Sequence, residues 1–254
     1  MDGNGRWARE KGRERIYGHQ NGVQSVRACI EESGKKGVKY LSLFAFSEEN
    51  WDRPQEEVKA LMEMMIKAIR DESHKLIQNK IRFLVLGNKE RLSATLRKEI
   101  ASLEEATAKD YESTLIIFLS YSGKWDISQA AVRMAQAGDT DIEKYLVTYG
   151  IPDPDLIIRT SGEQRISNYL LWQAAYSEFY FTDTLWPDFR EAEFDKALEE
   201  YAKRDRRYGK VKYLSYICIL IRNKTCNEVE KTHIICSGDA DRNDLIRPAN
   251  GLCG

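Results

Sequence analysis

The stretch TLIIFLSY, residues 114–121, is apolar along almost its whole length. A short apolar run of this kind predicts a buried strand. The segment WDISQAAVRMAQA, residues 125–137, follows it and is expected to form a helix. A strand followed by a helix is the repeating unit of an α/β fold.

The same alternation continues on both sides of this unit. It predicts a mostly parallel central sheet that is wrapped by helices, with right-handed crossovers. The further strands are expected at 39–46, 81–87, 155–161 and 178–183. The further helices are expected at 58–77, from Ser93 to about Ala108, from about Asn168, and at 191–207.

Composition limits the class of protein. The chain has 254 residues, 42% of them hydrophobic and 31% charged, which suits one large soluble domain. The net charge of -1 favours neither nucleic acid nor a membrane as partner. No apolar run reaches the roughly 20 residues of a membrane span. No secretory signal is visible, so we expect a cytoplasmic protein.

The composition changes sharply near Lys210. Residues 1–210 contain one of the five cysteines, and residues 211–254 contain the other four. We therefore expect a catalytic domain over 1–210 and a disordered or read-through tail over 211–254. Three of the tail cysteines and His233 could ligate zinc, but their spacing fits no common zinc site.

Unusual polar segments follow the predicted strands. They are SEENWDRP at 47–54, SGKW at 122–125 and RTSGEQRIS at 159–167. Open parallel sheets bind ligands at the carboxyl ends of their strands. The segment DGNGRWA at 2–8 would fit the same rule, although no strand precedes it.

The residue types in these segments suit a diphosphate. Glycines next to Asp2 and Arg6 allow backbone N–H groups to approach an anion closely. A carboxylate beside an anion is unfavourable unless a cation lies between them, and Mg²⁺ bound by carboxylate and phosphate oxygens resolves that conflict. Arg159 and Arg165 carry the planar forks that match phosphate oxygens.

Each of these features also has an ordinary structural explanation. DGNG alone is most often a turn. Arg15 and His19, spaced i and i+4, could lie on a solvated helix face, and Arg159 and Arg165 could form surface ion pairs. Their common position at one edge of the predicted sheet favours a binding site. The chain has no GxxxxGK[ST], GxGxxG or DDxxD motif.

Taken together, the motifs resemble those of the cis-prenyltransferase family, in particular its bacterial undecaprenyl diphosphate synthases. The resemblance covers residues 1 to about 210. It is carried, in chain order, by DGNGRWA, RxxGH from Arg15 to His19, FSEENWDRP, SGKWDI, PDLIIRTSGEQRISNYLLWQ, AYSEFYFTDTLWPDF and RDRRYG.

The resemblance implies a Mg²⁺-dependent homodimeric enzyme that adds isopentenyl diphosphate units, each with a cis double bond, to an allylic primer such as farnesyl diphosphate. The product would be a long polyprenyl diphosphate, such as the lipid carrier of cell-wall synthesis. Its release implies transient contact with a membrane surface. The growing chain would lie in an apolar tunnel, for which the helix with Leu61, Met62, Met65 and Ile69 offers a wall or simply a core face.

The resemblance also assigns roles to single residues. Asp2 would bind the metal, and Glu178 would help to organise the metal site and the subunit interface. Asn50 would assist proton removal within a mobile loop that also contains Ser47, Trp51 and Arg53. The allylic diphosphate would be held by Gly3, Asn4, Gly5, Arg6, Trp7, Arg15 and His19, and the isopentenyl diphosphate by Arg159, Arg165 and Ser167. A C-terminal RxG element at 207–209 would reach towards a partner's diphosphate site.

Departures from the family pattern lead to further expectations. Family members usually have a strand before DGNGRWA, so we expect weak metal binding and reduced stability, which an added upstream strand would correct. Removal of residues 211–254 should leave activity intact, and the short segment 137–150 should have little effect on the site. The alternatives are a weakly active or inactive truncated homologue, a non-catalytic partner subunit, and a generic anion-binding protein.

Overall fold

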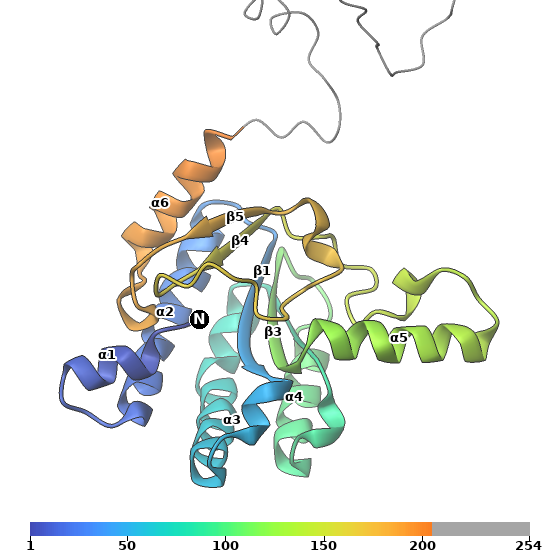
Figure 1. Ribbon diagram of the computed structural model, residues 1–254, viewed down its shortest axis with the longest axis horizontal. Coiled ribbons are helices and arrows are strands. Elements are labelled where there is room, and N and C mark those ends of the chain that lie inside the picture. The colour runs from blue at the N-terminus through green and yellow to red at the C-terminus, as the bar shows by residue number, and fades with distance from the viewer. Residues whose placement is uncertain (205–254) are drawn as a thin grey trace, which may run out of the picture. The chain divides into compact units, whose positions relative to one another are not determined.

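Parallel strands and covering helices alternate along the chain in the computed structural model, which describes residues 1–204 (Figure 1). The strands are β1 (Tyr40–Ser47), β2 (Ile81–Leu86), β3 (Ser113–Tyr121), β4 (Leu156–Arg159) and β5 (Glu178–Phe181). The α-helices are α1 (Asn4–Glu10), α2 (Arg15–Lys35), α3 (Gln55–Gln78), α4 (Ala94–Ala106), α5 (Gly123–Ala137) and α6 (Glu191–Ala202). Short 3-10 turns are η1 (Glu48–Asp52), η2 (Lys89–Arg91), η3 (Ile142–Tyr145), η4 (Gln173–Tyr176) and η5 (Trp186–Asp188).

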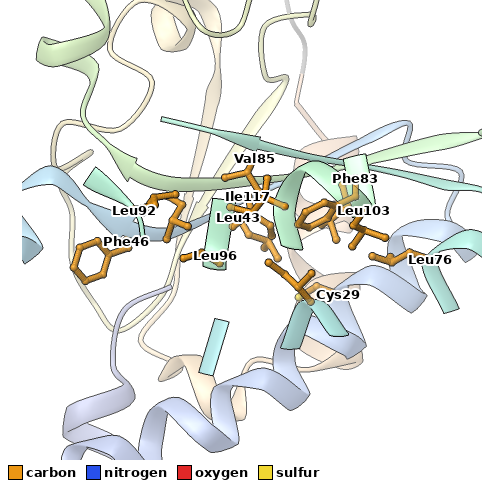
Figure 2. Packing of buried hydrophobic residues seen from close by; sticks show 14 of the residues in the cluster. Cys29, Leu43, Phe46, Leu76, Phe83, Val85, Leu92, Leu96, Leu103 and Ile117 are labelled. Carbon is orange, nitrogen blue, oxygen red and sulfur yellow. The ribbon is translucent and has the colours of Figure 1, made fainter. Parts of the chain in front are cut away.

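The strand over 114–121 is the centre of the fold, as its apolar composition predicts. β3 lies between β1 and β2 in a three-stranded sheet and is parallel to both. Its odd-numbered residues, such as Ile117, pack with α3 and α4 in the main core (Figure 2). Its even-numbered Phe118 packs on the other face in an aromatic cluster with Phe44 and Tyr169. Both faces of the strand are therefore buried.

The expected α/β class is confirmed, but the strands do not form one sheet. β4 and β5 pair with each other, in parallel and from Leu156↔Glu178 to Arg159↔Phe181, as a separate two-stranded sheet. No described strand joins β1 to β4.

Two helix predictions need correction. The helix expected from about Asn168 is absent from the described residues, and only the turn η4 forms there. Ser167, Asn168 and Leu170 have positive φ angles, which an α-helix of L-residues does not allow. The helix expected at 191–207 ends at Ala202 within the described part. Its apolar side chains that pack on the core, Phe194 and Leu198, all precede that end.

Some expectations concern residues beyond 204. The tail at 211–254, its possible zinc ligands and the RxG element at 207–209 lie outside the described residues. Within residues 1–204 no helix is both long and apolar enough to cross a membrane.

Candidate functional site

Asp2 is fastened beside the carboxyl end of β4 by its own backbone. Its N–H donates to Thr160 Oγ1 at 3.0 Å, and the Thr160 hydroxyl donates to the Asp2 carbonyl at 2.8 Å. The same carbonyl accepts a hydrogen bond from the Trp186 N–H at 3.0 Å. Residue 2 is therefore held at the edge where the sequence predicts the ligand.

Arg159, the last residue of β4, links Asp2 to the loop that follows. Its Nε donates to Asp2 Oδ2 at 3.0 Å, and its Nη2 lies 2.9 Å from the same oxygen. Its Nη1 donates to Ser167 Oγ at 2.8 Å and to the Arg165 carbonyl. The Arg159 side chain is 12% exposed and the Asp2 side chain 47% exposed, so the arginine is the fixed partner and the carboxylate faces open space.

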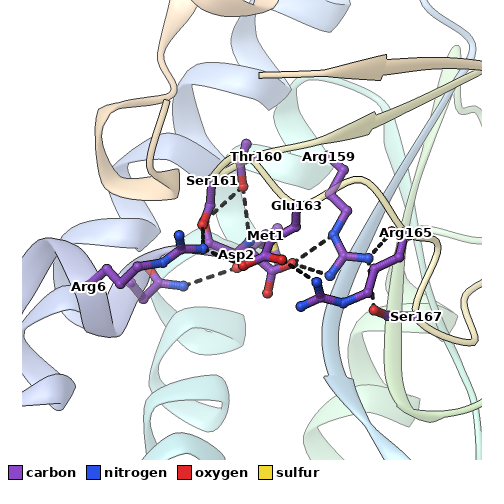
Figure 3. A network of polar contacts seen from close by, with 10 residues as sticks. Met1, Asp2, Arg6, Arg159, Thr160, Ser161, Glu163, Arg165 and Ser167 are labelled. Carbon is purple, nitrogen blue, oxygen red and sulfur yellow. Dashed lines mark hydrogen bonds and ion pairs between the residues drawn. The ribbon is translucent and has the colours of Figure 1, made fainter. Parts of the chain in front are cut away.

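Glu163 contacts two further arginines at this edge, Arg6 and Arg165 (Figure 3). Its Oε1 accepts a hydrogen bond from Arg6 Nη2 at 2.9 Å, and its Oε2 accepts one from Arg165. Arg6 also donates to Ser161. Glu163, Thr160 and Ser161 are site residues that were not predicted from the sequence. The signal was available, because all three lie in the RTSGE segment that supplied Arg159.

The DGNG segment is not a loop but the start of a helix. Gly3, with φ 107°, precedes α1, which begins at Asn4. The predicted glycine cradle is thus the first turn of α1, where backbone N–H groups lack intrahelical partners. The helix lies tightly on α2, since a Cβ at Gly18 would be 1.9 Å from the Asn4 carbonyl oxygen.

The Arg15–His19 pair lies on α2, as its helical spacing predicts. Arg15 Nε lies 3.1 Å from Glu57 Oε1 on α3, and Arg53 Nη1 donates to the same oxygen at 3.2 Å. Burial, and then the charges of Arg15 and Arg53, lower the pKa of His19 to about 4. His19 is therefore neutral at pH 7, and its buried Nε2 has no hydrogen-bond partner in the described part.

A cavity of about 1190 Å³ opens beside these groups. It is larger than the roughly 300–1,000 Å³ typical of small-molecule pockets. Its apolar walls include Leu61, Met62, Met65 and Ile69 of α3, so the helix that the sequence offered as tunnel wall or core face lines this space. Its polar lining includes Asp2, Asn4, His19, Ser47, Asn50, Arg53, Arg159, Arg165 and Ser167.

Other predicted site residues lie outside the cavity lining. Gly3, Gly5, Arg6, Arg15 and Trp51 are not part of it, although Gly3 and Gly5 flank the lining residue Asn4 and Trp51 follows the lining residue Asn50. The ring of Trp7 stacks on Tyr17 at 5.8 Å, beneath Lys11, between the first two helices. Glu178 begins β5, at the opposite end from Arg159, and its carboxylate accepts a hydrogen bond from Arg204 at 2.7 Å.

The described residues contain no cluster of three or more metal-ligating side chains. Asp2 and Glu178 lie at opposite ends of the two-stranded sheet, so one chain does not bring both to one metal ion. Asp2 supplies one exposed hard oxygen donor at the arginine edge. Such a donor fits an ion that takes most of its other ligands from substrate phosphates and water, as Mg²⁺ does.

An α/β fold with an arginine-rich edge beside a large cavity with apolar walls suits a ligand that has an anionic head group joined to an apolar chain. Comparison with known proteins agrees. The family described as "Putative undecaprenyl diphosphate synthase" matches residues 1–209, and the chain belongs to this family.

Individual relatives cover most of the chain. An isoprenyl transferase of Fusobacterium nucleatum is 50% identical over 217 residues, 84% of this chain and 94% of its own length. A ditrans,polycis-undecaprenyl-diphosphate synthase of Haemophilus ducreyi, named as specific for (2E,6E)-farnesyl diphosphate, is 48% identical over 82% of this chain and 91% of its own. The crystal structure of lavandulyl diphosphate synthase from Lavandula x intermedia, in complex with dimethylallyl diphosphate, has a TM-score of 0.80 and 36% identity over 83% of this chain and 95% of its own.

Proposed function

We propose that this chain is a cis-prenyltransferase that condenses isopentenyl diphosphate with an allylic diphosphate, farnesyl diphosphate as primer, to build a long polyprenyl diphosphate. The proposal depends mainly on one observation, that the charged and the apolar parts of the site line one cavity. Arg159, Arg165 and Asp2 line the same cavity as the apolar residues of α3. A prenyl diphosphate has the matching two parts, an anionic head and an apolar chain.

The reaction forms one carbon–carbon bond and breaks one carbon–oxygen bond. The terminal carbon of the isopentenyl double bond attacks C1 of the allylic primer, and the diphosphate leaves with the electrons of its bond. Loss of a proton from the isopentenyl unit then restores a double bond. Close and aligned placement of the two substrates supplies much of the rate enhancement.

The arginines of the edge stabilise the leaving group in this proposal. Negative charge grows on the diphosphate as the bond breaks, and preorganised guanidinium groups stabilise that charge. Arg6 and Arg165 are held in place by Glu163, and Arg159 by Ser167 and the Arg165 carbonyl. By the family resemblance, the Arg6 side binds the allylic diphosphate and the Arg165 side the isopentenyl diphosphate.

Asp2 would hold Mg²⁺ together with diphosphate oxygens, and the ion would neutralise charge on the leaving group. Neutral His19, whose Nε2 has no hydrogen-bond partner among residues 1–204, can donate to or accept from a polar group of the primer. Asn50 lies on the cavity wall and is the residue to which the resemblance assigns proton removal.

We also propose that the enzyme works as a homodimer. Large aromatic side chains are exposed near η4, namely Tyr149 at 67%, Trp172 at 40% and Tyr176 at 74%. Exposed aromatic groups of this kind are enriched at protein interfaces. Sedimentation equilibrium should give twice the chain mass, and a monomer would contradict this part of the proposal. Action in the cytoplasm with transient membrane contact follows from the resemblance alone.

The test is an assay of the purified chain with farnesyl and isopentenyl diphosphates and Mg²⁺, with products sized by chromatography. We expect a long polyprenyl diphosphate that is lost when the metal is chelated. A folded chain that binds the diphosphates without making product would instead be a partner subunit or an anion-binding protein, and the proposal would fail.

A further inference from the structure

The turn η1 lies between β1 and α3 and brings two cavity-lining residues of the candidate site together. Asn50 is within the turn and Arg53 follows it. Asn50 Oδ1 accepts the Ser47 N–H at 3.1 Å, so the turn closes on itself at its start. Two residues outside the turn, Ser120 and Arg91, fasten it to the rest of the fold through Glu48 and Trp51, and neither of them lines the cavity.

Ser120 is the first fastening point. Its hydroxyl accepts the Trp51 Nε1–H at 2.7 Å and donates to Glu48 Oε1 at 2.5 Å. The residue is fully buried near the end of β3 and has a φ of 52°. Positive φ is uncommon for residues with a side chain, and such outliers concentrate at functional positions. One hydroxyl thus joins both ends of the turn to the central strand.

Arg91, in η2, is the second fastening point. Its Nη1 donates to Glu48 Oε2 at 2.7 Å, and its guanidinium carbon lies 4.8 Å from the centre of the Trp51 ring. Phe46 meets the same ring edge to face at 5.1 Å. Both oxygens of Glu48 and the indole N–H of Trp51 are therefore engaged, which restricts the turn more than any single surface ion pair would.

We propose that Ser120, Glu48 and Arg91 form a latch that holds η1, part of the segment that the resemblance implies to be mobile, in the position that the structure shows, so that Asn50 and Arg53 face the reacting ends of the substrates. The three latch residues are positioning residues, which act through the turn and do not touch substrate. The inference rests on the proposed prenyl transfer, because the turn is expected to position the groups that act on the isopentenyl unit.

The test compares Arg91→Gln with the wild-type chain in the presence of both diphosphates and Mg²⁺. Small displacements of a positioned group reduce rates strongly, and we expect kcat to fall about tenfold. KM for the allylic diphosphate should stay within about twofold, since its expected contacts lie at Arg6, Arg15 and His19. Amide hydrogen exchange at 47–53 should become faster, with the core strands unchanged.

Arg70→Gln is the matched control. Arg70 pairs with Glu99 at 2.6 Å between α3 and α4, away from the cavity. Its loss removes an arginine–glutamate pair of similar exposure and should change neither kcat nor exchange at 47–53. Equal effects of Arg70→Gln and Arg91→Gln would overturn the latch.

A second test uses Glu48→Gln and the double variant Glu48→Gln/Arg91→Gln. It keeps the proposal testable if Arg91→Gln alone folds poorly. If the pair acts as one unit, the double variant should be no slower than the slower single variant. Additive losses would contradict the latch, as would faster exchange with unchanged kcat. A wild-type chain without activity would contradict the proposed function, whereas the exchange data alone would then decide whether the latch holds the turn.

Discussion

The two parallel sheets differ in burial and in chemistry. β3 is buried from Thr114 to Tyr121, whereas every residue of β4 is only partly buried. The three-stranded sheet packs apolar side chains on both faces, and the two-stranded sheet leads at its carboxyl end into the charged segment that holds Asp2. The main apolar core therefore lies against the three-stranded sheet, and the arginine edge follows the two-stranded sheet. Substitutions in that core and at that edge should have separable effects on stability and on activity.

Asp2→Asn tests the charged edge and has the largest expected effect. Loss of the carboxylate removes the proposed metal ligand and the partner of Arg159, and kcat/KM should fall by at least about a hundredfold. The melting temperature should change by less than about 4 °C, since the group is half exposed. An assay at saturating Mg²⁺ with a parallel melting curve checks both. A large fall in melting temperature with normal activity would show instead that Asp2 serves stability and not catalysis.

Leu96→Ala tests the contribution of the main core to stability. Leu96 is fully buried in the main core beneath the three-stranded sheet and does not line the cavity. The free energy of unfolding should fall by about 3 kcal/mol, measured by urea denaturation. Activity per folded molecule at 25 °C should stay within about twofold of wild type. Val132→Ala, at an exposed position on α5, should leave the unfolding free energy within about 0.5 kcal/mol.

Met65→Trp tests whether the cavity holds the growing chain. A larger ring on the α3 wall reduces the space for the growing chain, so products should be shorter while the first condensation proceeds at a rate within about threefold of wild type. Lys67→Trp places the same ring on the exposed face of α3, where the lysine side chain is 76% exposed. Chromatography should show the full product length for this control. Unchanged product length with Met65→Trp would contradict a chain-holding role for the cavity.

A dependence of stability on pH is the smallest expected effect. The pKa of His19 is about 4 in the folded chain and about 6.5 when unfolded, so the unfolded chain binds more protons between these values. Stability from this group is complete above about pH 6.5 and is lost as the pH falls towards 4. From pH 7 to 5 the wild type should lose about 1–2 kcal/mol more than His19→Gln. Equal losses in urea denaturation would contradict a buried neutral histidine.

Local sequence signals predicted the strands well. The apolar runs at 81–87 and 114–121 became β2 and β3 with nearly the same bounds, because burial on a parallel sheet demands such runs. The polar segment after β4 also reached the expected edge. The helix from about Asn168 was wrong, since positive φ angles at Ser167 and Asn168 override a helical composition.

Long-range pairing explains what the sequence could not predict. The division into two sheets depends on which strands pair, and this information is not local to either strand. The position of Glu163 in the RTSGE segment was a usable signal, but its contact with Arg6, far away in the chain, appears only in the fold. The separation of Glu178 from Asp2 also appears only once β4 and β5 are paired in register.

Titration calorimetry at several temperatures tests the division between charged edge and apolar cavity most directly. The ligands are farnesyl diphosphate and inorganic diphosphate, both with Mg²⁺. Burial of apolar surface gives a negative heat-capacity change on binding. We predict a clearly negative value for farnesyl diphosphate, a value near zero for inorganic diphosphate, and weaker binding of both by Arg159→Gln. Equal heat-capacity changes for the two ligands, or unchanged affinity in Arg159→Gln, would contradict the account.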